Sequence, residues 1–312
     1  MKIVITGADG FIGSNLSNAL INKNFDVLNI VKKNQSNKNK NFIIKKIHRR
    51  TNWSKIFKNY DILIHCAGIS SNKNIKSKND IDNLYEINTY CLENLIDEAF
   101  RSGIKKIIFF STFKILNNEN YVKNEGYFLR TKFDYYTHSK FLAEKILINK
   151  AKKYKNKIII LRIPAVYGKN MKGGLNLLTN LIRKKIPLPF KFINNKKSFL
   201  GLKNLTDLIL YLCSKPEKKY DKDIFNIADI EILSTEKLIY KISKYLNIKC
   251  LIFYFPKIII KIFSKIFGFN DLYISSYEDL YFDCENDYNI LDWYPKFSLD
   301  NQLKEYLNDT FL

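Results

Sequence analysis

The chain has 312 residues, of which 46% are hydrophobic and 26% are charged, and it carries a formal net charge of +22. These fractions are typical of a globular protein and exclude a disordered chain. The length is enough for one large domain or two modest ones. No run of about 18 uncharged apolar residues occurs, so we expect no membrane span.

The cysteines are scattered, odd in number and form no paired motif: Cys66, Cys91, Cys213, Cys250 and Cys284. This usage suits a reducing compartment and indicates neither a disulfide framework nor a zinc site. We therefore expect a cytoplasmic protein that binds no metal. The first residues already have the pattern of a core strand, so we expect no signal peptide.

The excess of positive charge comes almost entirely from lysines dispersed along the chain. Reading of bases favours the bidentate guanidinium of arginine, and no nucleic-acid motif is present, so we expect no nucleic-acid partner. The lysines read as solvated faces. Their summed field would still attract an anionic small molecule such as a nucleotide sugar.

The first thirteen residues have the pattern of a dinucleotide-binding turn. A short β-branched run, residues 3–5, predicts a buried parallel strand that leads into Gly7, Gly10 and Gly13. The helix that begins at Phe11 and Ile12 would direct its N-terminal N–H groups at a pyrophosphate. A glycine triplet alone can be a structural turn. Here an amphipathic helix and a second strand, residues 25–31, follow it on schedule, which favours cofactor binding at these five residues.

The end of the second strand bears on which cofactor is bound. NAD-binding folds of this kind place an acidic residue there to hold the ribose 2′-OH, but this strand ends in Val31, Lys32 and Lys33. Lys32 can pair with a 2′-phosphate, so we expect an NAD(P) cofactor with NADP(H) slightly favoured over NAD(H). The alternative is that both lysines only begin the polar loop 32–40.

Strands and helices alternate as far as residue 110, which predicts a Rossmann-type doubly wound parallel sheet, an α/β fold. The third and fourth strands are expected at 42–47 and 61–68, a short amphipathic segment at 53–57, a helix at 81–101 and a strand at 106–110. Ala67 and Gly68 would leave room for the cofactor at the carboxyl edge of the sheet. We expect His65 to be packed in its strand and not catalytic.

The strand at 106–110 is followed by Ser111 and Thr112, and a later helix carries Tyr136 and Lys140. Residues four apart share a helix face, so both side chains can reach one site. A tyrosine hydroxyl has a pKa near 10, and a nearby ammonium favours the phenolate that a base needs. The same spacing recurs elsewhere, at Tyr211/Lys215, Tyr240/Lys244 and Tyr245/Lys249. Only the pair Tyr136/Lys140 comes after both a nucleotide-binding half with its glycine turn and a Ser-Thr at the end of a strand.

These motifs together resemble the NAD(P)-dependent epimerase/dehydratase family, extended short-chain dehydrogenases/reductases, over essentially the whole chain. Further motifs fall in family order: Asn88, the run Leu161-Arg162-Ile163-Pro164-Ala165-Val166-Tyr167-Gly168 and the tail Leu291-Asp292-Trp293-Tyr294-Pro295. The resemblance implies catalysis by Thr112, Tyr136 and Lys140, with Ser111 beside the cofactor.

Finer motifs resemble a bacterial subgroup labelled UDP-glucose or UDP-N-acetylhexosamine 4-epimerase, to which reductases of 4-keto sugars in surface-polysaccharide pathways are also assigned. The resemblance therefore implies a role in the synthesis of surface-polysaccharide precursors. The motifs include Lys172-Gly173-Gly174, Ile186-Pro187-Leu188-Pro189 and Asn195-Lys196-Lys197-Ser198. The resemblance implies substrate contacts at Lys114 and at Lys197, where relatives usually have arginine. Thr137 and Ala165 also depart from the usual residues. Dehydratases of the family need Asp-Glu directly after the catalytic threonine, and the Phe113-Lys114 pair here disfavours dehydration.

We expect residues 1–168 to form the NAD(P)-binding domain, with returning segments from about 198–229. Residues 169–312 would form a smaller α/β lobe that binds the nucleotide sugar. Within it, residues 251–267 are strongly apolar with Lys257, Lys261 and Lys265 at four-residue spacing, a pattern of either a lobe helix or a membrane-surface helix. We expect a homodimer.

The favoured function is an NAD(P)-dependent 4-epimerase that acts by hydride transfer at C4 of a UDP-hexose or UDP-N-acetylhexosamine. The alternative is an NADPH-dependent reductase of 4-keto sugar nucleotides, which shares the same catalytic residues. A more remote alternative is a non-catalytic nucleotide-binding protein on the same fold.

Overall fold

A parallel sheet of seven strands forms the centre of the first of two compact units in the computed structural model. The structure describes residues 1–33, 39–70, 75, 77–116, 135–154, 157–171, 173–215, 220 and 222–309. The strand order is β3-β2-β1-β4-β5-β6-β9. The strands are β1 (Lys2–Thr6), β2 (Asp26–Val31), β3 (Lys40–Ile43), β4 (Ile62–His65), β5 (Lys106–Thr112), β6 (Lys157–Ile163) and β9 (Ile224–Asn226). The order reverses between β1 and β4. In open sheets of this kind ligands bind outside the carboxyl ends of the strands at that point.

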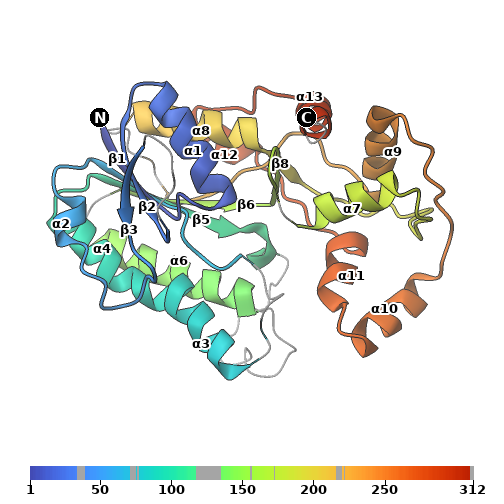
Figure 1. The fold of residues 1–312 in the computed structure, drawn as a ribbon, viewed down its shortest axis with the longest axis horizontal. Helices are drawn as coiled ribbons and strands as arrows, with labels where there is room; N and C mark the ends of the chain where they lie inside the picture. The colour runs from blue at the N-terminus through green and yellow to red at the C-terminus, as the bar shows by residue number, and fades with distance from the viewer. Residues whose placement is uncertain are drawn as a thin grey trace. The chain divides into compact units, whose positions relative to one another are not determined.

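Helices cover both faces of this sheet (Figure 1). One face carries α1 (Phe11–Asn22) and α8 (Leu202–Ser214). The other carries α2 (Ser54–Phe57), α4 (Cys91–Arg101) and α6 (Tyr135–Tyr154), whose apolar sides join the strands in one core. The predicted doubly wound α/β fold is therefore confirmed.

Several predicted element boundaries are wrong. β3 occupies Lys40–Ile43 and not 42–47, and β5 continues through Thr112, so Ser111 and Thr112 are strand residues. The predicted helix 81–101 begins earlier, at α3 (Lys78–Tyr85), because Ser77 forms a capping box with Asp80. It is also interrupted by a π-helical turn, Glu86–Tyr90, before α4. Alternation of apolar residues cannot reveal such a turn.

His65 is packed in its strand, as predicted. It is buried, its ring lies 5.9 Å from that of Phe109, and its Nδ1 is 2.8 Å from the Thr6 hydroxyl. Burial, and to a smaller extent repulsion by the Lys140 ammonium, lowers the pKa of His65 to about 3. The ring is therefore neutral.

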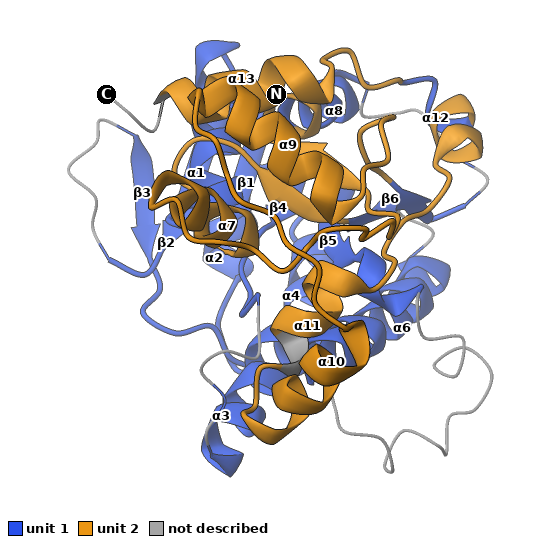
Figure 2. Ribbon diagram, turned by 90° about the vertical axis from the view of Figure 1, so that its right-hand side faces the viewer, with its two compact units in different colours: residues 1–163, 206–226, 290–293 blue, residues 164–205, 227–289, 294–312 orange. Residues whose placement is uncertain are grey.

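The structure divides into two compact units, coloured separately in Figure 2: residues 1–163, 206–226 and 290–293, and residues 164–205, 227–289 and 294–312. The second unit, which we call unit 2, has a small parallel pair, β7 (Ala165–Tyr167) and β8 (Phe199–Gly201). Its helices are α7 (Gly174–Arg183), α9 (Thr235–Leu246), α10 (Lys257–Ile266), α11 (Asn270–Tyr277) and α13 (Leu299–Asp309), and most of α12 (Glu285–Leu291) also belongs to it.

A buried carboxylate holds the centre of unit 2 together. Asp229 accepts hydrogen bonds from the Tyr167 hydroxyl at 2.9 Å, the Gly201 N–H at 3.0 Å and the Asn204 amide at 2.7 Å. Burial raises the pKa of Asp229, and these donors oppose that effect. Tyr167, which the sequence places in a family motif, and Asn204 therefore have structural roles here.

No helix in the described part of the chain is both long and apolar enough to cross a bilayer. The same residues contain no group of three His, Cys, Asp or Glu side chains able to hold a metal ion. All five cysteines are free thiols.

Candidate active site

The glycine turn between β1 and α1 leaves no space for side chains at two of its positions. Gly7 has φ +67°, and a Cβ there would lie 2.7 Å from the backbone N and Cα of Ala67. A Cβ on Gly13 would overlap the carbonyl oxygen of Gly7 and approach Ala8 Cα to 2.9 Å. The turn is thus packed against both β4 and its own helix, as a phosphate-binding cradle requires.

Replacement of Gly13 by alanine should destabilise the protein by about 2 kcal/mol, because the new methyl group meets backbone that cannot rotate away. Cofactor affinity should fall with it, since the turn must open. Urea unfolding and a cofactor titration measure the two effects. Gly103 to alanine is a poor control because its φ is +97°. Gly174, a helical glycine with open space at its Cβ position, is the matched control and should tolerate alanine.

A hollow of about 400 Å³ opens beside this turn at the carboxyl edge of the sheet. Residues expected to bind the cofactor line it: Gly7, Gly10, Lys32, Ala67 and Gly68. Phe11, Ile12 and Gly13 form the first turn of α1. The backbone of Gly10 adopts an extended conformation before that helix, so the N-terminal N–H groups of α1 begin at this loop. The hollow and the turn together fit a dinucleotide.

Three lysines and one carboxylate line the part of the hollow next to β2 and β3. Lys32 follows β2, and Lys45 and Lys46 follow β3, the neighbouring parallel strand. Asp9, from the glycine turn, also lines the hollow, and its carboxylate accepts the backbone N–H of Lys32 at 3.3 Å. Asp9 was not expected from the sequence, because folds of this kind place their acidic residue at the end of β2. Lys45 and Lys46 were not expected either, because only the register of β2 with β3 brings them near Lys32.

Lys140 is buried beneath the hollow. Its Nζ donates to the carbonyl of Phe110 at 2.9 Å and lies 4.5 Å from the centre of the Phe109 ring. It is also 3.7 Å from where a Cβ on Gly68 would be, which ties it to the lining of the hollow. Burial lowers the pKa of Lys140 to about 8, a fall that Cys66, Cys91 and Glu144 partly oppose.

Tyr136 lies one helical turn before Lys140 in the first turn of α6, so the two side chains share a face. Lys114 is directed at it, with the ammonium 5.8 Å from the centre of the Tyr136 ring. Thr112 is the last residue of β5, and its hydroxyl oxygen accepts the N–H of Lys114 at 3.3 Å. The end of β5 and the start of α6 thus carry the three residues expected to be catalytic.

Asn88 connects the rim of the hollow to α6. Its side-chain amide accepts from the N–H of Ile69 at 2.8 Å and donates to the carbonyl of Ile69 at 2.9 Å and to the Ser139 hydroxyl at 3.0 Å. Ser139 in turn donates to the carbonyl of Tyr136 at 2.7 Å. The π-helical turn carries Asn88, and irregular turns of this kind are frequent at functional sites.

Ser111, expected beside the cofactor, has its hydroxyl directed at a buried ion pair. It donates to Glu144 at 2.5 Å, and the same carboxylate accepts two bonds from Arg162, at 2.9 and 2.6 Å. Glu144 lies one turn beyond Lys140 on α6, so this network fixes α6 against β5 and β6.

Lys197, in unit 2, is buried between backbone segments. Its N–H donates to the carbonyl of Leu233 at 2.9 Å and its Nζ to the carbonyl of Ser275 at 2.5 Å. The ammonium is therefore held at the C-terminal end of α11, where a cation complements the helix dipole.

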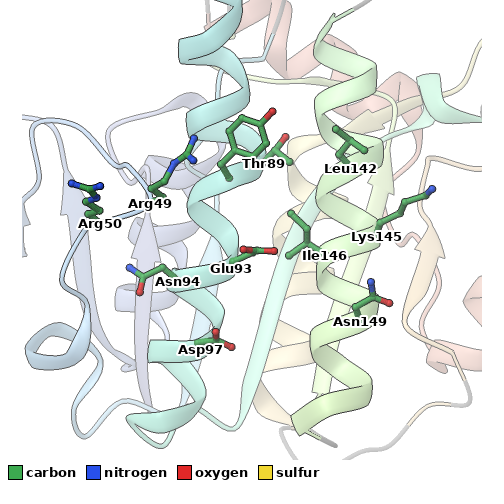
Figure 3. A pocket seen from close by; sticks show the side chains of 11 residues that line it. Arg49, Arg50, Thr89, Glu93, Asn94, Asp97, Leu142, Lys145, Ile146 and Asn149 are labelled. Carbon is green, nitrogen blue, oxygen red and sulfur yellow. The ribbon is translucent and has the colours of Figure 1, made fainter. Parts of the chain in front are cut away.

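A second hollow, of about 680 Å³, lies on the outer side of α4 and α6 (Figure 3). Its lining includes Arg49, Glu93, Lys145 and Ile146, and no residue of the glycine turn. It has no phosphate cradle, so it does not offer the dinucleotide the glycine turn that borders the first hollow.

Comparison with known proteins tests what this geometry indicates. The model of the "NAD dependent epimerase/dehydratase family" matches residues 3–228, which include the glycine turn, the hollow and the Tyr-Lys pair. The chain belongs to this family. The resemblance inferred from the motifs is thus confirmed.

Among curated relatives of this family member, a Vibrio cholerae "UDP-glucose 4-epimerase" is 29% identical over 97% of the chain and 94% of its own length. An Escherichia coli "dTDP-4-dehydro-6-deoxyglucose reductase" is 26% identical over 98% and 96%.

Solved structures of epimerases share the fold of this family member. The UDP-N-acetylglucosamine 4-epimerase from Bacillus cereus superposes with a TM-score of 0.77 at 18% identity, over 99% of this chain and 98% of the other. UDP-glucose 4-epimerase from Thermotoga maritima, solved with UDP-glucose, gives 0.76 at 20% identity over 100% and 99%.

Proposed function

We propose that this protein is an NAD(P)-dependent 4-epimerase of UDP-hexoses or UDP-N-acetylhexosamines. The observation that carries the proposal is the buried ammonium of Lys140, held by the Phe110 carbonyl next to Gly68 and one turn from Tyr136. Lys140 has no ion pair among the residues that the structure describes, and a buried cation of this kind costs stability, so its presence in the core supports a chemical task. The Vibrio cholerae relative, named for the same activity, supports the choice of reaction.

In this proposal Tyr136 removes the proton of the sugar 4-OH and returns it. The Lys140 ammonium favours the phenolate form of Tyr136 and orients the cofactor ribose. Thr112 donates its hydroxyl proton to the same sugar oxygen, since its own oxygen already accepts the Lys114 N–H. When bound, the nicotinamide supplies a reversible acceptor and donor of hydride at C4.

A Cβ at Gly7 or at Gly13 would meet the protein's own backbone, and such a closely packed glycine turn supports dinucleotide binding at this position. We propose that Gly7, Gly10, Phe11, Ile12 and Gly13 hold the pyrophosphate. Ala67, Gly68 and Ser111 would border the nicotinamide half, with Ser111 acting through its backbone because its hydroxyl is engaged by Glu144.

For the substrate, we propose that Lys114 and Lys197 contact the UDP-sugar and that unit 2 supplies most of the binding residues. Lys114 lies over the Tyr136 ring and so belongs to the same site. Lys197 would give up its bond to the Ser275 carbonyl for a phosphate oxygen, a charge-assisted and therefore stronger partner.

The alternative is an NADPH-dependent reductase of 4-keto sugar nucleotides, favoured by Lys32, Lys45 and Lys46 around the hollow. A reductase that consumes NADPH needs a binding site for the cofactor's 2′-phosphate, and lysines can form one. The two functions separate in one experiment. An epimerase interconverts two UDP-sugars at a constant concentration of reduced nicotinamide, and a reductase oxidises one NADPH for each 4-keto sugar. Stoichiometric NADPH consumption with no interconversion would overturn our choice.

We infer that NADP(H) binds more tightly than NAD(H), because the three lysines outnumber the Asp9 carboxylate. Exchanging Lys32, Lys45 and Lys46 together for glutamine should weaken NADPH binding about tenfold, at up to 1 kcal/mol per exposed pair, and leave NADH binding nearly unchanged. Tryptophan or nicotinamide fluorescence measures both affinities.

The matched control for that experiment exchanges Lys23, Lys55 and Lys58, which are equally exposed and precede β2 and β4 at the opposite edge of the sheet. It lowers the net charge equally and should leave both affinities unchanged. Equal losses for NADPH and NADH in the first variant would contradict the proposed phosphate site.

Dehydration is disfavoured in this proposal, because neither side chain after Thr112 is a carboxylate: Phe113 is buried and Lys114 faces Tyr136. A non-catalytic nucleotide-binding role is also disfavoured, because such a protein has no use for Lys140 at its buried position. If the protein turned over no member of a panel of UDP-sugars, the non-catalytic nucleotide-binding role would become the better proposal.

We further propose a homodimer that acts in the cytoplasm. The hollow on α4 and α6 is lined by the cations of Arg49 and Lys145, the carboxylate of Glu93 and the apolar Ile146, a mixture of charge and apolar surface that suits a two-fold interface (Figure 3). The free thiols suit a reducing compartment. Light scattering on the purified protein tests the oligomeric state.

A further inference from the structure

The helix α10 presents apolar side chains to solvent. Ile258 and Ile266 are both 70% exposed. The following exposed residues belong to this helix or follow it directly, and we call them the α10 apolar face: Ile258, Ile262, Phe263, Ile266, Phe267 and Phe269. Monomeric proteins rarely expose so many large apolar side chains on one short segment, so the face has a use.

Helical geometry orders the rest of α10 around this face. Ser264, on the opposite side of the helix, is buried and donates to the carbonyl of Lys261 at 2.8 Å. Lys257, Lys261 and Lys265 are each one residue before an exposed isoleucine, so they form a row along one edge of the α10 apolar face. The helix therefore has a packed side, a cationic edge and an apolar outer side.

The cationic edge has little counter-charge of its own. Between residues 251 and 277 the sequence contains a single acidic residue, Asp271. Lys257 lies 3.7 Å from Glu278 at the surface. Lys261 and Lys265 form no ion pair with the residues that the structure describes. Excess positive charge at this edge seeks an anionic surface.

We propose that α10 docks the protein onto an anionic lipid bilayer, with the α10 apolar face among the acyl chains and the lysine row at the headgroups. The arrangement is that of an interfacial helix, whose attraction combines buried apolar area with charge. A second copy of the chain is the poorer occupant, since a two-fold axis through this face would bring two lysine rows together.

The dimensions agree with a helix that lies in the interface. α10 has ten residues and is therefore about 15 Å long, half the thickness of a hydrocarbon core. Figure 1 shows it side by side with α11 in the same unit, so the packed side is already occupied. This proposal does not depend on the proposed activity.

The test is sedimentation of the full-length protein with vesicles. The protein should bind vesicles of equimolar phosphatidylcholine and phosphatidylglycerol at least tenfold more tightly than vesicles of phosphatidylcholine alone. Exchange of Lys257, Lys261 and Lys265 for glutamine should weaken the binding to anionic vesicles about a hundredfold. Exchange of Ile258, Ile262 and Ile266 for serine, which leaves the charge intact, should weaken it more than tenfold.

The charge-matched control exchanges Lys237, Lys244 and Lys304, exposed lysines elsewhere in unit 2, for glutamine and should bind vesicles almost normally. An equal loss in the control would show that net charge alone drives binding and would overturn the proposal. So would unchanged binding of the serine variant, and a drop in its mass by light scattering would then identify a second copy as the occupant. Circular dichroism verifies that each variant is folded.

Discussion

Replacing Tyr136 by phenylalanine should lower the turnover number of the epimerase about a thousandfold, because the hydroxyl that moves the proton of the sugar 4-OH is removed while the ring remains. The affinities for cofactor and UDP-sugar should change little, since the ring keeps its place beneath Lys114. Steady-state kinetics with the preferred UDP-sugar and isothermal titration of both ligands provide the comparison.

Tyr240 to phenylalanine is the control for this variant, because Tyr240 also precedes a lysine by four residues on a helix, Lys244 on α9, and is exposed. Its loss should leave turnover unchanged. If the Tyr136 variant kept more than half of the normal turnover, another group would have to be the base.

Lys140 to methionine should have opposite effects on activity and on stability. Activity should fall about a thousandfold, since the phenolate loses the adjacent cation. The free energy of unfolding at pH 7 should rise by about 2 kcal/mol. The shift in the pKa of Lys140 from its ordinary 10.5 to about 8 corresponds to a burial cost of about 3 kcal/mol, and loss of the bond to Phe110 offsets about 1 kcal/mol.

The pH dependence of this gain follows from the direction of the shift. The folded protein releases the Lys140 proton near pH 8, whereas the unfolded chain holds it until about pH 10.5. The free-energy cost of the buried ammonium is complete below pH 8 and disappears as the pH rises from 8 to 10.5. The stability advantage of the methionine variant over the wild type should therefore shrink in that range. Urea unfolding at pH 7 and pH 10 measures both. Lys152 to methionine, on the exposed side of α6, should change stability by less than about 0.5 kcal/mol. A methionine variant that is less stable than the wild type at pH 7 would contradict this account, because it would mean that interactions in the folded protein fully offset the burial cost of the Lys140 ammonium.

The beginning of the fold followed directly from the sequence, since β1, the glycine turn and α1 are local in sequence and each has a distinctive residue pattern. The sequence also placed Thr112, Tyr136 and Lys140 at the strand end and the helix start where the structure has them. It did not predict that β5 includes Ser111 and Thr112, because polar residues at a strand end resemble a loop.

Other features depend on contacts between distant residues and had no local signal. Lys45 and Lys46 join the hollow only through the register of β2 with β3. Asp9 reaches Lys32 across the turn. The burial of Lys140 requires β4, β5 and α6 together, and no spacing of residues can report it.

A labelled substrate tests the proposed epimerase most directly. UDP-hexoses and UDP-N-acetylhexosamines carrying deuterium at C4 are incubated with the protein and a catalytic amount of oxidised cofactor, and the products are analysed by NMR. The account predicts, for at least one of these sugars, the 4-epimer with deuterium still at C4 and no net change in reduced nicotinamide. Failure to form any 4-epimer, or transfer of the deuterium in stoichiometric amount to free reduced cofactor, would contradict it.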